Sequence, residues 1–262
     1  MKNIVPISSL IDLSGKTVIV TGGAQGIGLG IVYRLAEAGA SVMIADFKEQ
    51  EALQSAKDLS DKGWKVKFVK VDVSQEKDVK KMAEETVKVF GGIDILVNNA
   101  GIYPASLVEQ MTAADFDKVI AVNLKGVFLC TKYASEQMIK QNRGGKIINV
   151  TSIDALHPSS VGLAHYDASK HGVWGFSKNV ALELAPHKIW VNAIAPGAIE
   201  TPGVTQGKPL RADILEKFIA KIPMQTMGQP DDIGKAALFL ASELSSYMTG
   251  AQIVVDGGVL LS

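Results

Sequence analysis

Cysteine is almost absent from the chain, since Cys130 is the only one among 262 residues. A single cysteine excludes a disulfide within the chain, and a lack of disulfides is typical of proteins from reducing compartments. Long apolar runs are absent too. The first twelve residues lack the apolar core of a signal peptide, and no stretch reaches the roughly 18–20 apolar residues of a membrane helix. We therefore expect a soluble, cytoplasmic protein that does not enter a membrane.

An excess of one charge is also missing, because 27 Lys and Arg residues balance 27 Asp and Glu residues and the formal net charge is zero. Proteins that bind nucleic acids need a surplus of cationic side chains. We therefore expect no nucleic-acid partner, and we assign no metal ligands. The composition, with 47% hydrophobic and 21% charged residues, is that of an ordinary globular protein with a small-molecule partner.

What the chain does contain is a regular alternation of short apolar runs with longer amphipathic stretches. Apolar runs of strand length indicate strands buried on both faces, and their separation by helices indicates a parallel sheet. Right-handed connections place helices on both sides of that sheet. We expect strands at 16–21, 41–46, 65–71, 94–97, 146–151, 189–195 and 252–255, and helices at 27–38, 49–62, 75–90, 116–141, 166–184 and 231–242. The expected fold class is α/β, with a doubly wound parallel sheet flanked by helices.

No linker divides the chain, so we expect one domain over residues 13–262 after an N-terminal extension, residues 1–12. The segment 202–230 lies between a predicted strand and a predicted helix and is rich in Gly and Pro. Ligands of parallel α/β proteins lie beyond the carboxyl ends of the strands, from which this segment departs. We interpret it as a lid that covers the substrate, and a surface excursion is the alternative.

A glycine-rich stretch joins the first predicted strand to the first predicted helix, with Gly22, Gly26 and Gly28 in the sequence TGGAQGIG. Glycine lets the backbone turn tightly and approach a pyrophosphate, whose charge the N–H groups of the helix start would meet. The spacing departs from the usual G-x-G-x-x-G fingerprint. A tight turn without a ligand therefore stays open as an alternative.

Acidic and amide residues follow the neighbouring strands. Asp46 ends the second strand, where a carboxylate can bind an adenosine ribose and repel a 2′-phosphate, which favours NAD over NADP. Asn98 and Asn99 follow the fourth strand and either tie strand ends together or bind a ligand. Asp72, after the third strand, is open in the same way, with an adenine contact as the functional option. Each residue alone is also compatible with a simple turn.

Tyr166 and Lys170 lie four residues apart in a predicted helix and share one face of it. A free tyrosine has a pKa of about 10, and a nearby ammonium or a positively charged nicotinamide would lower it. Such a tyrosine can exchange a proton with an alcohol while hydride moves to or from a cofactor. Ser152, just past the fifth strand, could hold the substrate oxygen, and a helix cap is its alternative role.

Together these motifs resemble the short-chain dehydrogenase/reductase family in its one-domain form. The resemblance covers residues 13–258 and implies a Rossmann-like sheet of seven strands, a nicotinamide cofactor and a homotetramer. The motifs that carry it, in chain order, are Thr21–Gly28, Asn98–Gly101, Ser152, Tyr166-x-x-x-Lys170 and Pro196-Gly197.

The resemblance implies a role for each matching residue. Tyr166 matches the acid/base, Lys170 the residue that lowers its pKa and binds the nicotinamide ribose, and Ser152 the hydrogen-bond partner of the substrate oxygen. Asn123 matches an asparagine that holds a water in a proton relay to the lysine. The cofactor residues implied are Gly22, Gln25, Gly26, Ile27 and Gly28 in the loop, Asp46 at the ribose, Asp72 and Val73 at the adenine, Asn98, Asn99, Ala100 and Gly101 at the adenosine side, Tyr166 and Lys170, and Pro196, Gly197, Ile199 and Thr201 at the carboxamide and phosphates.

Ser152 and Tyr166 are 14 positions apart, one more than in many members of the family. The intervening stretch contains Asp154, His157 and His165, any of which could face the substrate. A polar residue with no role in the chemistry is the alternative for each of them.

The function we expect is hydride transfer between NAD(H) and a secondary alcohol or ketone, such as a sugar, a polyol or a cyclic alcohol. One alternative is a 3-oxoacyl-(acyl-carrier-protein) reductase. Such enzymes favour NADP and carry a basic patch, so Asp46 and the balanced charge count against it. A second alternative is a non-catalytic NAD-binding sensor or assembly subunit. The intact set of Ser152, Tyr166 and Lys170 counts against that one.

Overall fold

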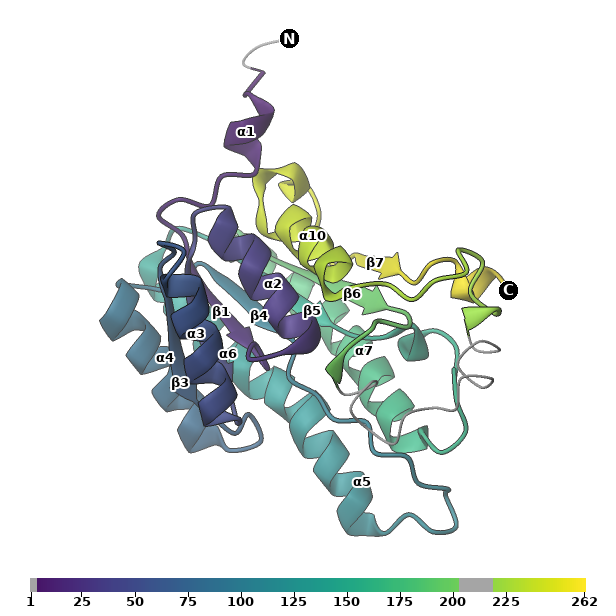
Figure 1. The fold of residues 1–262 in the computed structure, drawn as a ribbon. Helices are drawn as coiled ribbons and strands as arrows, with labels where there is room; N and C mark the ends of the chain where they lie inside the picture. Colours follow the sequence, from purple (N-terminus) through teal and green to yellow (C-terminus); the bar gives the residue numbers. More distant parts are fainter. Residues whose placement is uncertain (1–3, 203–218) are drawn as a thin grey trace.

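The structure is a computed structural model that describes residues 4–202 and 219–262. One parallel sheet of seven strands runs through its centre in the order β3-β2-β1-β4-β5-β6-β7 (Figure 1). This confirms the expected α/β fold with a doubly wound, Rossmann-like sheet. The strands are β1 (Thr17–Thr21), β2 (Ser41–Asp46), β3 (Val66–Lys70), β4 (Ile95–Asn98), β5 (Gly145–Val150), β6 (Ile189–Pro196) and β7 (Gln252–Val255).

Adjacent residues of the central strands face opposite sides of the sheet and belong to two different cores. Val18 and Val20 of β1 pack with the helices on one face, whereas Ile19 between them packs with the helices on the other. Burial on both faces explains why these strands are continuous apolar runs in the sequence. The helices are α1 (Ile7–Leu10), α2 (Gly26–Glu37), α3 (Glu49–Ser60), α4 (Glu76–Phe90), α5 (Ala113–Ile120), α6 (Gly126–Gln141), α7 (Ala164–Leu184) and α10 (Pro230–Ala241).

The predicted strands agree with those observed to within one residue at each end. The predicted helix over 116–141 is wrong in its middle, where a π-helical turn, Ala121–Lys125, separates α5 from α6. A π-turn inserts a residue into the helical repeat, and such insertions are frequent at functional sites. Asn123 lies inside this turn. Sequence periodicity gives no sign of it, because the apolar pattern continues through the turn.

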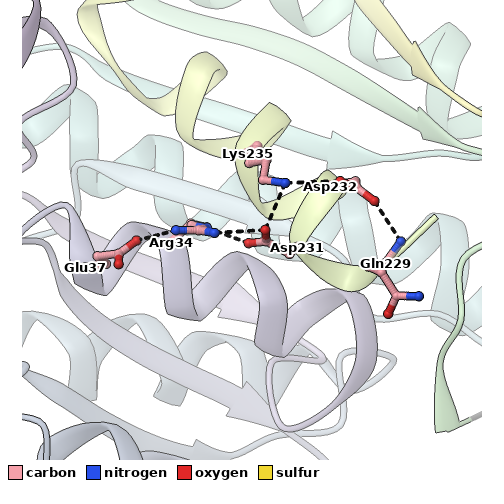
Figure 2. A network of polar contacts seen from close by, with 6 residues as sticks. All are labelled: Arg34, Glu37, Gln229, Asp231, Asp232 and Lys235. Carbon is pink, nitrogen blue, oxygen red and sulfur yellow. Dashed lines mark hydrogen bonds and ion pairs between the residues drawn. The ribbon is translucent and has the colours of Figure 1, made fainter.

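The helices α2 and α10 lie side by side over one face of the sheet (Figure 1). Their backbones approach closely at two glycines, since a Cβ at Gly30 would lie 2.5 Å from the Pro230 carbonyl oxygen and one at Gly234 would lie 2.5 Å from the Gly30 oxygen. Figure 2 shows the ion pairs along the seam, where the Arg34 guanidinium binds both oxygens of Asp231. These contacts fix α2, the helix that follows the glycine-rich loop, against α10.

The order of the strands reverses between β1 and β4, and such a switch point opens a crevice at the carboxyl edge of a parallel sheet. Most of the segment interpreted as a lid, residues 203–218, lies outside the described residues, so the lid stays a prediction. In its described remainder, Gly228 pairs with Ile199 just after β6. Among residues 4–202 and 219–262, no helix is long and apolar enough to span a bilayer.

Candidate active site

The glycine-rich loop is tied to the end of β4 by hydrogen bonds. The Thr21 hydroxyl accepts the backbone N–H groups of Asn99 and Ala100 at 3.0 and 3.1 Å. The Asn99 side-chain amide donates to the carbonyl oxygens of Thr21 and Gly22, both at 3.0 Å. Asn99 is therefore a brace that holds the ends of β1 and β4 together at the switch point.

This bracing leaves space only for glycine at positions 22 and 28. Gly22 has φ +64°, and a Cβ there would lie 2.9 Å from the Ala100 Cα. A Cβ at Gly28 would clash with the Gly22 carbonyl oxygen and lie 2.6 Å from the Asn99 amide nitrogen. The loop thus folds tightly over the first turn of α2, as a backbone cradle for a phosphate requires.

The start of α2 has its N–H groups available for an anion. Gln25 is the N-cap residue, and its side chain makes no capping hydrogen bond within the described part of the chain. Gly26 follows with φ +55°, and a Cβ there would lie 3.3 Å from Thr201. Ile27 in the same turn packs against the core. An uncapped helix start facing a glycine cradle fits the pyrophosphate of a dinucleotide.

The segment after β6 forms the opposite side of this cradle. Gly197 is held close to the last strand, because its N–H donates to Val255 at 2.9 Å and a Cβ would lie 2.7 Å from the Asp256 Cα. Pro196 and Ile199 are buried beside it. The residues that the resemblance implies at the carboxamide and phosphates are thus brought to the glycine-rich loop, with Thr201 in contact with Gly26.

Asp46 is buried at the carboxyl end of β2, next to the glycine-rich loop. Its carboxylate accepts the backbone N–H groups of Ala24 at 3.0 Å and Lys48 at 2.9 Å. A carboxylate oxygen can accept more than one hydrogen bond, so these contacts leave capacity for a ribose hydroxyl. The result is a fixed negative charge beside the phosphate cradle.

Three other residues of the adenosine side have packing or turn-forming roles. The Asn98 amide donates to Thr131 at 3.1 Å and to Asn149 at 2.8 Å, which is the strand-tying role that the sequence left open. One oxygen of Asp72 accepts the N–H and the hydroxyl of Ser74 in the turn before α4. Val73 packs against α6, where a Cβ at Gly126 would lie 2.9 Å from it. Contacts of Asp72 and Val73 with adenine stay predictions.

Tyr166, Lys170 and Ser152 come together at the carboxyl edge of β5. Lys170 lies one turn after Tyr166 on α7, with its Nζ 5.5 Å from the centroid of the tyrosine ring. The same ammonium donates to the Val150 carbonyl oxygen at 2.8 Å. Ser152 is buried and hydrogen-bonded to Tyr166. The three residues therefore form the cluster that the sequence predicts.

Burial controls the protonation of this cluster. It raises the pKa of the Tyr166 phenol well above its usual value, and the hydrogen bond with Ser152 opposes this only in part. Burial also lowers the pKa of Lys170 to about 8, against the charge of Asp154. The expected lowering of the Tyr166 pKa is therefore absent from the chain by itself, because desolvation is the largest cause of the shift and raises the pKa. The resting phenol is a proton donor.

Gly101 and Asn123 lie next to this cluster, on the side of Lys170. A Cβ at Gly101 would lie 3.4 Å from the Asn123 side-chain oxygen and 3.8 Å from the Lys170 Nζ, so the backbone of Gly101 lies beside both side chains. The Asn123 amide donates to the Ile102 carbonyl oxygen at 2.9 Å and to Ser169 at 3.1 Å, and its oxygen accepts the Ile102 N–H. Asn123 thus joins the loop after β4 to α7, and the water relay stays a prediction.

The three polar residues between Ser152 and Tyr166 have different positions. Asp154 is buried and accepts the Ser152 hydroxyl at 2.7 Å. His165 is fully buried, and its Nδ1 accepts the Tyr166 N–H at 3.0 Å, while its Nε2 has no partner among the described residues. His157 is exposed on the loop. Asp154 and His165 therefore belong to the surroundings of the reacting groups, and His157 contacts neither Ser152 nor Tyr166.

Tyr103 is a site residue that the sequence did not predict. Its half-exposed ring meets the Tyr166 ring edge to face, with the centroids 6.0 Å apart. Tyr103 lies two residues after the Asn98–Gly101 stretch. An aromatic residue so soon after a turn that is expected to face a ligand is the signal that could have identified it. Tyr103 thus offers an aromatic surface beside the acid/base.

Comparisons with known proteins agree with this geometry. Residues 22–260 match the family model described as enoyl-(acyl carrier protein) reductase. The 3-oxoacyl-(acyl-carrier-protein) reductase of Aquifex aeolicus is 40% identical over 95% of this chain and 99% of its own length, and that of Thermotoga maritima is 41% identical over 95% and 99%. The structure of a short-chain type dehydrogenase/reductase from Mycobacterium marinum is similar with a TM-score of 0.93 and 36% identity, covering 98% of this chain and 100% of that chain. The chain is an oxidoreductase that belongs to the short-chain dehydrogenase/reductase family.

Proposed function

We propose that the chain transfers a hydride between NAD(H) and a ketone or secondary alcohol, with Tyr166 as the group that exchanges the proton. The observation that supports this most directly is the cluster of Ser152, Tyr166 and Lys170 beside the glycine cradle. A protein that only binds the nucleotide has no need of a buried lysine next to a partly buried phenol, since burying a lysine costs stability. This disfavours the sensor or assembly subunit.

In the reductive direction a reduced nicotinamide, held by the glycine-rich loop, would supply a hydride to the carbonyl carbon. Tyr166 donates its phenolic proton to the carbonyl oxygen, so that one hydride and one proton convert the ketone to the alcohol. Ser152 keeps that oxygen within reach of the phenol. The Lys170 ammonium, fixed by the Val150 carbonyl, stabilises the phenolate that remains. The oxidative direction uses the same groups in reverse.

NAD is the cofactor that the charge distribution favours. The carboxylate of Asp46 is buried at the end of β2 and held by two backbone N–H groups beside the glycine-rich loop. The carboxylate cannot move away from a 2′-phosphate without losing these two hydrogen bonds. The negative charges of the carboxylate and the 2′-phosphate would therefore repel each other. The cofactor that lacks the 2′-phosphate is therefore expected to bind more tightly.

The names of the similar proteins support a different substrate from the sugar or polyol that we expected first. Both the Aquifex and the Thermotoga proteins are called 3-oxoacyl-(acyl-carrier-protein) reductases. A 3-oxoacyl thioester is a ketone, so it fits the same chemistry at Tyr166. We therefore rank a 3-oxoacyl thioester first and a small polyol or cyclic alcohol second. The preference of such reductases for NADP and the position of Asp46 make an NADH-dependent variant of that activity the specific proposal.

The test is a panel of substrates followed by NADH absorbance. It should contain acetoacetyl coenzyme A, a cyclic ketone and a set of polyols, each with NADH or NAD and with NADPH or NADP. Turnover of the thioester with NADH above that with NADPH is the expected result. Turnover of polyols alone would reverse the substrate ranking. NADH binding without turnover of any ketone or alcohol would favour the sensor and overturn the proposal.

A further inference from the structure

Two loops beside the acid/base cluster are joined to each other at their tips. One follows β4 and contains Tyr103, whose ring meets the ring of Tyr166. The other follows β5 and runs from Ser152 to the start of α7. The Ser106 N–H of the first loop donates to the Gly162 carbonyl oxygen of the second at 2.9 Å. The two loops therefore form one continuous wall that begins at the reacting groups.

This wall is fixed at the cluster as well as at its tip. The Ser159 N–H donates to Asp154 at 2.8 Å, and Asp154 accepts the Ser152 hydroxyl at 2.7 Å. In the other loop Ser106 is three residues from Tyr103, and three residues of chain span at most about 11 Å. A substrate of several carbons held at the cluster can therefore reach the tip of the wall.

The two loops are poor in charge and rich in exposed apolar side chains. Residues 101–108 and 155–164 contain no Asp, Glu, Lys or Arg, although these types make up 21% of the chain. Leu107 is 39% exposed, Leu156 46% and Val161 85%. Leu107 and Val161 are sequence neighbours of the two residues that are hydrogen-bonded at the tip. A contiguous exposed apolar surface next to a reaction centre is typical of a binding surface for an apolar group.

We propose that the wall formed by residues 101–108 and 155–164 binds an unbranched carbon chain of the ketone substrate, and that Leu107 and Leu156 make the site select longer chains. This inference rests on the proposed function and specifies the substrate class within it, a 3-oxoacyl group with several carbons beyond the ketone. The wall is continuous with the reacting groups, which favours the substrate over a second protein as its occupant.

The chemistry of the wall also separates the two ranked substrate classes. A polyol bound there would lose hydrogen bonds with water, and this costs free energy unless protein groups replace them. The hydroxyl groups of a polyol would meet leucine and valine side chains instead. An alkyl chain, in contrast, gains affinity with every CH₂ group that leaves water. The wall therefore favours the acyl chain.

The test measures binding without turnover, in the Tyr166→Phe protein with NADH present. Saturation-transfer NMR gives the Kd of ethyl 3-oxobutanoate, ethyl 3-oxohexanoate and ethyl 3-oxooctanoate, which differ only in the chain beyond the ketone. We expect Kd to fall about fourfold for each added CH₂ group, the gain from burying a methylene. With Leu107→Asn and Leu156→Asn together, the fall should be less than about twofold per CH₂ group, because asparagine keeps much of the size of leucine but loses its apolar surface.

Leu182→Asn is the matched control, since it makes the same substitution at an exposed leucine of α7. At 1.5 Å per residue, Leu182 lies about 24 Å along the helix from Tyr166, so the chain-length dependence should stay unchanged. A Kd that is independent of chain length, or a dependence that the control and the double variant change equally, would overturn the proposal. So would a double variant that alters the sedimentation of the protein but not the Kd, because the loops would then cover a second copy. Turnover by the unsubstituted chain tests the proposed function separately, and its absence would leave this binding series decisive for the wall.

Discussion

The two halves of the site are built from different parts of the polypeptide. At the nucleotide end the backbone is decisive: Gly22 and Gly28 leave no space for a side chain, and Asn99 braces the loop. At the chemical end the decisive groups are buried side chains, with Lys170 and Ser152 almost inaccessible to solvent. The comparison teaches that adding an atom should damage the first half, whereas removing a single polar group should disable the second.

The largest effect is expected from removing one oxygen at the chemical end. Tyr166→Phe should lower kcat by about 10²–10⁴, the usual contribution of a general acid or base, and leave NADH binding nearly unchanged. Kinetics on the substrate identified by the panel and NADH fluorescence titration measure the two quantities. Tyr103→Phe, which removes the same oxygen from the adjacent ring, is the control and should retain most of the activity. Near-normal turnover of Tyr166→Phe would show that the proton comes from elsewhere.

Adding one carbon at the nucleotide end is the converse experiment. Gly28→Ala should destabilise the fold by about 1–3 kcal/mol, as overpacking does, and strongly weaken NADH binding because the loop must move away from α2. Urea unfolding and fluorescence titration check this. Gly175→Ala, on an exposed part of α7 where a Cβ meets nothing within 4 Å, is the control and should stabilise by about 0.5–1 kcal/mol. Equal NADH affinity in both variants would remove the contrast between the two halves.

The burial of Lys170 should make stability depend on pH. Its pKa is about 8 in the folded chain against 10.5 for an ordinary lysine. Below pH 8 both states hold the proton and the folded chain bears the full cost of a buried ammonium. As pH rises from 8 to 10.5 the folded state releases the proton first, so stability rises relative to a chain without this lysine, by on the order of 3 kcal/mol in total.

Lys170→Met is the comparison that measures this. Urea unfolding of both chains from pH 7 upward, in a Tyr166→Phe background so that the phenol does not titrate, gives the difference in unfolding free energy. The advantage of the methionine chain should shrink with rising pH. A difference that stays constant over this range would show that Lys170 is not neutralised by burial.

The smallest effect concerns the charge beside the cradle. Asp46→Asn keeps the acceptor for the Ala24 N–H but removes the charge, and the ratio of kcat/KM for NADPH over NADH should rise roughly tenfold, or about 1.4 kcal/mol. Asp58→Asn, on the exposed face of α3, removes the same charge away from the loop and should leave the ratio unchanged. If the two variants give equal ratios, the carboxylate of Asp46 does not discriminate between the cofactors.

Much of the architecture follows from the sequence alone. Strands that are buried on both faces appear as short continuous apolar runs, and such runs depend only on neighbouring residues. Every strand of the sheet was therefore predicted to within one residue at each end. Glycines at the end of β1 and the Tyr166–Lys170 spacing likewise result from local geometry. These features can be recognised because they depend on residues that are close together in the sequence.

Other features arose only in three dimensions. The π-turn at Asn123 exists because its side chain bonds to Ile102 and Ser169, which are distant in the sequence. The high pKa of Tyr166 follows from the protein packed around it, and the alternation of residue types contains no information on that desolvation. The bond from the Ser152 hydroxyl to Asp154 depends on the path of a loop of which the sequence showed only the length and the polar residues. Local periodicity thus determined the scaffold, whereas burial and long-range hydrogen bonds decided the protonation of the groups that it carries.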